Sequence, residues 1–110
     1  MIIDKDRRIA EEPKRQLLTH HGERIRRVIL YRSRAQGRAT EDSDFDFLVV
    51  EKDPVSKREE MRRLRQALSG LDYPVDVWVM GEEEFEETRE VIGGLAYPVH
   101  KYGVVLYENT

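Results

Sequence analysis

The chain has 110 residues, of which 39% are hydrophobic and 37% are charged, so it can form one modest core and is too polar to enter a membrane. Nineteen basic residues against 22 acidic ones give a formal charge of -3, so there is no general electrostatic reason to bind nucleic acid. Cysteine is absent, and no apolar run approaches the ~20 residues of a membrane span. The first residues lack the order of a signal peptide, so we expect one cytoplasmic domain over residues 1–110.

The sequence of the first dozen residues does not indicate a definite element. We expect the first helix to begin near Pro13. Proline lacks an amide hydrogen and clashes with the preceding turn inside a helix, whereas it suits a first turn. This helix is expected to end near His21, with Gly22 as its stop. Residues 27–31 are rich in strand formers and predict a buried strand. A short helical turn closed by a glycine follows at 33–38.

Residues 44–50 predict a second strand, solvated on one face in its first half and buried in its second half. Ser56 has the capping-box spacing to Glu59 and starts an amphipathic helix over residues 56–69. The remaining predicted elements are a strand at 75–80, helices at 82–89 and 95–102, and a strand at 104–107. This order predicts an α/β (α+β) fold with a small mixed sheet covered by helices.

Two aspartates, Asp44 and Asp46, lie two residues apart on the predicted second strand. Their side chains should point to one face, with Cβ atoms about 7 Å apart. Two carboxylates aimed the same way repel each other unless a cation lies between them. A hard ion such as Mg²⁺ takes oxygen ligands and keeps substrate phosphates as its other ligands. Taken alone, the pair also fits the solvent face of an amphipathic strand.

Two serines favour the metal-binding interpretation of this pair. Ser33 follows the first strand, where the chain turns into a helical segment whose backbone N–H groups can bind phosphate. Ser43 directly precedes Asp44. The ends of two neighbouring strands should therefore deliver a phosphate site and a metal-binding pair, which a nucleoside triphosphate with bound Mg²⁺ requires.

Residues 31–50 read YRSRAQGRATEDSDFDFLVV, which resembles the signature of the minimal nucleotidyltransferase family, a branch of the DNA polymerase β-like superfamily. The family pattern is Gly-Ser, ten residues, and then Asp-x-Asp; Ser33 and Asp44 have this spacing. The resemblance extends over nearly the whole chain, including residues 103–107, and implies the polymerase β-like palm fold.

The resemblance also implies roles for individual residues. Asp44 and Asp46 would bind the metal ions. Asp76, the family's third carboxylate, would complete the second metal site and help to deprotonate the acceptor hydroxyl. The residues that would contact the nucleotide phosphates are Ser33, Arg34, Ser43 and Arg32.

One position departs from the family pattern, because the glycine before the serine is Arg32 here. Glycine lets the backbone approach phosphate and adopt unusual dihedral angles. The arginine side chain can either grip phosphate or occlude the pocket. The first alternative is compatible with catalytic turnover, and the second would prevent it.

The activity that the resemblance implies is transfer of a nucleoside monophosphate, AMP from ATP, onto an acceptor hydroxyl with Mg²⁺ as cofactor. Many family members are antitoxins that bind a HEPN ribonuclease toxin and in some cases adenylylate it. We therefore expect a HEPN-type partner, or a second copy of this chain, to supply the acceptor site. Two alternatives stay open: a non-catalytic antitoxin with a vestigial nucleotide site, and a small-molecule nucleotidyltransferase of the antibiotic type.

Overall fold

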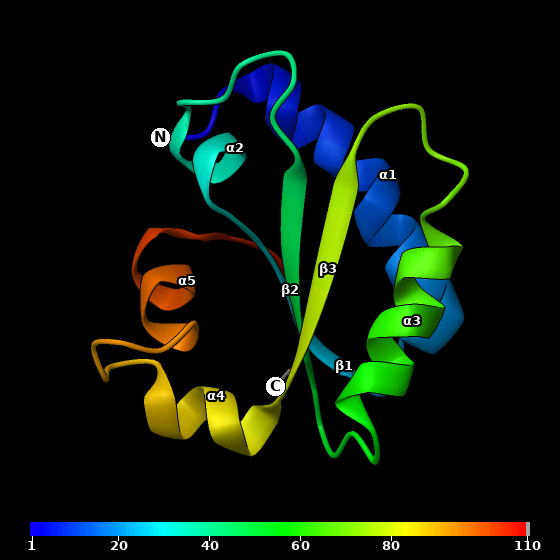
Figure 1. Cartoon of the computed structure of the whole chain (residues 1–110), viewed down its shortest axis with the longest axis vertical. Coiled ribbons are helices and arrows are strands. Elements are labelled where there is room, and N and C mark those ends of the chain that lie inside the picture. The colour runs from blue at the N-terminus through cyan, green and yellow to red at the C-terminus, as the bar shows by residue number, and fades with distance from the viewer. Residues whose placement is uncertain (110) are drawn as a thin grey trace.

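The computed structural model describes residues 1–109 and contains one four-stranded sheet with helices on both faces (Figure 1). The strands are β1 (Ile25–Tyr31), β2 (Phe45–Glu51), β3 (Val75–Gly81) and β4 (Val104–Glu108). They lie in the order β3-β2-β1-β4. β2 runs parallel to β3, and β1 runs antiparallel to both β2 and β4. The predicted α/β fold with a small mixed sheet is therefore confirmed.

Helices cover the two faces of this sheet in different ways. The helices are α1 (Asp4–His21), α2 (Ser33–Gln36), α3 (Lys57–Ala67), α4 (Glu82–Thr88) and α5 (Ala96–Tyr102). α1 and α3 pack on one face, while α4 and α5 lie over the other (Figure 1). Each face has its own apolar core, and β2 contributes alternate residues to both. This is why β2 is apolar on both of its sides.

β2 is more buried than its sequence predicts. We expected one face of its first half to be solvated, and this is wrong, because all seven residues of the strand are buried. β2 lies between β1 and β3, so even Asp46 is only 8% exposed. The strand begins at Phe45, and Asp44 lies just before it as an exposed residue. The two aspartates therefore occupy different environments.

The first helix also departs from expectation. α1 begins at Asp4 and contains Pro13, so the prediction that this helix begins near Pro13 is wrong. Proline cannot donate a hydrogen bond to the carbonyl of Ile9 one turn earlier. The hydroxyl of Tyr73 donates to that carbonyl oxygen instead, at 3.3 Å. The tertiary contact gives the carbonyl a partner that the helix cannot supply.

The other element predictions are confirmed with small changes at the ends. The side chain of Ser56 caps α3 by accepting a hydrogen bond from the amide of Glu59 at 3.2 Å. Gly22 is the C-cap residue of α1. Gly37 ends α2 with φ of 71°, and a Cβ atom there would collide with the carbonyl oxygen of Met1. Within residues 1–109, no helix has both the length and the apolar character needed to cross a bilayer.

Candidate functional site

Sheet register aligns three polar side chains from three neighbouring strands. Tyr31 of β1 lies opposite Asp46 of β2, and Asp46 lies opposite Asp76 of β3. Paired residues of adjacent strands point to the same face, so these side chains form a row across the sheet. Further along the strands, Leu48 and Met80 share this face and belong to the core under α4 and α5. The row therefore lies on the α4/α5 face, where Tyr31 belongs to the apolar core and the two aspartates do not.

The buried carboxylate of Asp46 lies among three charged neighbours, Arg32, Asp44 and Asp76. Burial raises the pKa of this carboxyl, Arg32 opposes the shift, and the charges of Asp44 and Asp76 raise the pKa further. Among the side chains that the structure describes, none forms an ion pair or a hydrogen bond with the carboxylate of Asp44 or Asp46. A buried carboxylate between two others is stabilised when a cation approaches it. The three aspartates are oxygen donors, which suits a hard divalent ion.

Tyr31 belongs to this site, although its sequence position alone did not single it out. The residue is 5% exposed. Burial, followed by the charges of Asp46 and Asp76, raises the pKa of its hydroxyl to about 12. The hydroxyl therefore stays protonated at neutral pH and can donate a hydrogen bond to an anionic group. The available sequence signal was its place at the end of a strand, directly before the Arg32-Ser33 step.

The turn from β1 into α2 carries Ser33 and the arginine that replaces glycine. Ser33 is the first residue of α2, and Arg32 is its N-cap residue with φ of 67° and ψ of -149°. Among the residues that the structure describes, Arg32 is the only non-glycine residue with a positive φ. This region of backbone space is essentially restricted to glycine. The turn thus keeps the shape that glycine would favour, and the arginine side chain is exposed to solvent.

Arg34 and Ser43 stabilise the loop that leads into β2. The guanidinium of Arg34 pairs with the buried Asp6 at 3.1 Å and donates from Nη2 to the carbonyl oxygen of Ser43 at 2.9 Å. It also stacks over the ring of Phe45, which belongs to the core under α1 and α3. The hydroxyl of Ser43 accepts a hydrogen bond from the amide of Thr40 at 2.9 Å. That Arg34 and Ser43 bind phosphate stays a prediction. Their hydrogen bonds and the Arg34–Asp6 ion pair within the protein do not favour it.

Asp76 is engaged by a residue that the sequence pattern did not reveal. Nε of Arg65, on α3, lies 3.0 Å from Oδ1 of Asp76. Consistent with this contact, the side chains that the structure describes include no group of three acidic, histidine or cysteine residues placed to hold a metal ion. The donor set of Asp44, Asp46 and Asp76 suits a divalent ion, and Asp76 is the member that already has a cationic partner.

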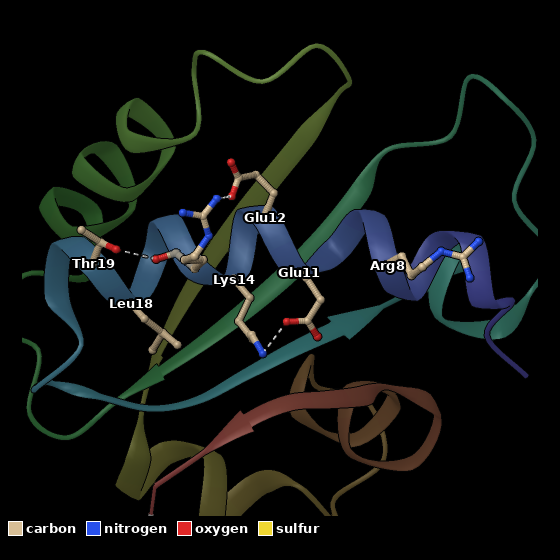
Figure 2. A pocket seen from close by; sticks show the side chains of 7 residues that line it. Arg8, Glu11, Glu12, Lys14, Leu18 and Thr19 are labelled. Carbon is tan, nitrogen blue, oxygen red and sulfur yellow. Dashed lines mark hydrogen bonds and ion pairs between the residues drawn. The ribbon is translucent and has the colours of Figure 1, made fainter.

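A groove lined by residues of α1 contains none of the three aspartates (Figure 2). Most of its polar side chains have partners along the helix. Lys14 and Glu11 form an ion pair at 2.6 Å, and Arg15 pairs with Glu12. The hydroxyl of Thr19 donates to the backbone carbonyl of Arg15 at 2.8 Å. Because these groups already have partners on the same helix, the groove indicates a solvated helix surface rather than a site.

The sequence and the fold of the chain are similar to those of known nucleotidyltransferases. A model of the nucleotidyltransferase domain family matches residues 10–97. No curated protein matches the chain significantly. A putative nucleotidyltransferase from Sulfolobus solfataricus superposes with a TM-score of 0.67 and 20% identity, covering 96% of this chain and 82% of that one.

Two similar structures come from toxin–antitoxin complexes. A mutant of the MntA-HpeT toxin–antitoxin superposes with a TM-score of 0.65 and 21% identity. A toxin–antitoxin with AMP-PNP gives 0.62 and 23%. Each match covers 91% of this chain and 74% of the other. At these identities, the structural comparisons show a shared fold.

Proposed function

We propose that this chain, which belongs to the nucleotidyltransferase domain family, transfers AMP from ATP onto an acceptor hydroxyl. The observation that supports the proposal most directly is the buried Asp46, which has no partner among residues 1–109 and lies beside Asp76 in the sheet. A divalent cation bound there would neutralise charge on the triphosphate and activate the attacking oxygen. The family match and this donor set support the same class of reaction.

Each residue of the row has a role in this proposal. Asp46 on β2 and Asp44, which lies just before the strand, would hold the cation. Asp76 would complete the cation site and help to remove the proton of the acceptor hydroxyl, as the hydroxyl oxygen bonds to the α-phosphorus and pyrophosphate leaves. Ser33 would orient the triphosphate from the first turn of α2, and the protonated hydroxyl of Tyr31 would donate to an anionic oxygen nearby.

We further propose that the acceptor lies on a HEPN-type toxin and that this chain acts as its antitoxin. The structural similarity to chains from toxin–antitoxin complexes supports this partner, and the complex with AMP-PNP supports an adenine nucleotide as the donor. Asp44 is exposed and Asp76 is partly exposed, so a partner could reach these carboxylates and would complete the acceptor side of the site.

Label transfer from ATP labelled at its α-phosphate tests the enzyme directly. The chain is incubated with its co-expressed partner and Mg²⁺, and separately with a panel of antibiotics and metabolites. We expect label on the partner, reduced about 10²-fold or more in Asp44→Asn and Asp46→Asn, because each removes charge from the cation site. Asp42→Asn is the matched control, since Asp42 is an exposed aspartate of the same loop outside the row.

Other outcomes of that assay identify the alternatives. Label on a small molecule, with none on the partner, would support the antibiotic-type enzyme. A partner that binds tightly and never receives label would support the non-catalytic antitoxin, which the strained Arg32 at the glycine position favours. In that case ATP with Mg²⁺ should also leave the melting temperature of the chain unchanged.

A further inference from the structure

Arg65 contacts three consecutive residues at the outer edge of the sheet. Its Nε lies 3.0 Å from Oδ1 of Asp76 and donates to the carbonyl oxygen of Val77 at 3.1 Å. Its guanidinium carbon lies 5.6 Å from the ring centroid of Trp78. α3 packs on the face opposite the aspartate row, and β3 is an edge strand of the sheet. The side chain of Arg65 therefore reaches around the sheet edge to the face that carries the row.

This contact conflicts with a role for Asp76 as a ligand. Arg65 holds the carboxylate from the edge, whereas a cation in the row would approach from the side of Asp46, its partner in the sheet. Two cations on one carboxylate repel each other. A divalent cation bound in the row would therefore weaken the ion pair between Arg65 and Asp76. Both partners are partly exposed, at 43% and 38%, and such pairs are weak enough for a bound ion to displace.

We propose that the Arg65–Asp76 ion pair is a latch that holds the third carboxylate at the sheet edge until a divalent cation enters the row. The proposal rests on the function proposed above, and it makes Arg65 a positioning residue. Turning Asp76 toward Asp46 releases the guanidinium from its place beside Trp78. Opening of the latch is therefore coupled to a change around that ring.

The fluorescence of Trp78 can report this change. Trp78 is its single tryptophan and is 45% exposed. Its ring packs against the guanidinium, a contact whose strength depends on the position of the cation. When Arg65 leaves, the ring gains contact with water, and its emission should shift to longer wavelength.

The first test measures Mn²⁺ binding to the full chain by calorimetry at physiological salt, which screens distant charges. We expect Arg65→Gln to tighten Mn²⁺ binding about two- to five-fold, because Asp76 no longer has a competing cation. Arg65→Lys, which keeps the charge, should bind as the wild type does. Arg62→Gln is the matched control: it removes the same charge from the same helix, but Arg62 pairs with Glu59. Equal tightening in Arg62→Gln and Arg65→Gln would overturn the latch.

The second test follows Trp78 emission during titration with Mg²⁺. The wild type should show a red shift that saturates with Mg²⁺, and Arg65→Gln should show none, because its latch is already open. Wild-type emission that stays constant while calorimetry shows cation binding would overturn the latch and leave the proposed function intact. If calorimetry detects no Mn²⁺ binding in the wild type or in Arg65→Gln, the metal-dependent function fails, and the latch fails with it.

Discussion

Arg32 occupies a backbone conformation that costs free energy for any residue with a Cβ atom. Its φ of 67° and ψ of -149° lie in a region essentially limited to glycine, and such strain costs about 1–3 kcal/mol. The structure tolerates this cost where β1 turns into α2, next to Ser33. The positive charge of the side chain opposes the rise in the pKa of the Asp46 carboxyl. Arg32 therefore has a strained backbone, and its side chain stabilises the charged form of the neighbouring Asp46.

Arg32→Gly should raise the free energy of unfolding by about 1–3 kcal/mol, less the entropy that glycine adds to the unfolded chain. Urea denaturation measures the change. Arg32→Gln is the control, because it removes the charge but keeps the Cβ atom and its strain, and it should leave stability nearly unchanged. Equal stabilisation by both variants would show that charge, rather than backbone strain, is responsible.

At the scale of elements, α1 shows how a distant residue completes a helix. Pro13 breaks the hydrogen-bond pattern of α1, and the hydroxyl of Tyr73, 64 residues away from Ile9 in sequence, donates to the carbonyl left without a helical donor. Tyr73 also packs against Phe45 at a ring-centroid distance of 5.3 Å. The same side chain therefore ties the helix to the start of β2.

Tyr73→Phe should lower the free energy of unfolding by about 0.5–1.5 kcal/mol, because the carbonyl of Ile9 loses its donor while the ring contacts remain. The same substitution in a Pro13→Ala background should cost much less, because the introduced alanine would supply the missing N–H. Chemical denaturation of the four proteins gives the coupling energy. A coupling near zero would contradict the assigned role of the hydroxyl.

At the scale of the whole molecule, β2 carries a buried acidic residue near each of its two ends. Asp46 lies near its start, in the row, and Glu51 lies at its far end and is fully buried. Burial, followed by the neighbouring carboxylate of Glu60, raises the pKa of Glu51 from 4.5 to about 7, while Arg24 and Arg63 oppose this shift. The fold therefore favours the protonated acid at this position.

This environment predicts that stability falls as the pH rises. Because the folded pKa of Glu51 lies above its unfolded value, its contribution is complete below about pH 4.5 and is lost as the pH rises through about 7. The loss should be on the order of 1–3 kcal/mol. Glu51→Gln mimics the protonated acid, so its unfolding free energy should vary less than that of the wild type between about pH 5 and about pH 8.

Denaturant melts across that pH range measure the effect. The exposed Glu59 of α3 provides the control, and Glu59→Gln should keep the wild-type pH dependence. A Glu51→Gln variant with unchanged pH dependence would contradict the assignment of the titration to Glu51.

Local patterns in the sequence determined the main elements and the central motif. The alternation in β2, the helical periodicity of α3 and the spacing of Ser33, Asp44 and Asp46 all depend on neighbours in sequence. Period 2 predicted both aspartates on one side of the chain, whereas only Asp46 lies within the strand. The same patterns predicted the fold class, which the structure and the family match confirm.

Only the tertiary structure decided which distant residues meet. The parallel register of β2 and β3 places Asp46 beside Asp76, and the antiparallel register of β1 adds Tyr31 to the row. The edge position of β3 lets Arg65 reach Asp76 from the opposite face. These contacts depend on strand order and on packing between remote segments, which no local periodicity encodes. The motif thus identified the aspartate pair, and the fold determined what surrounds it.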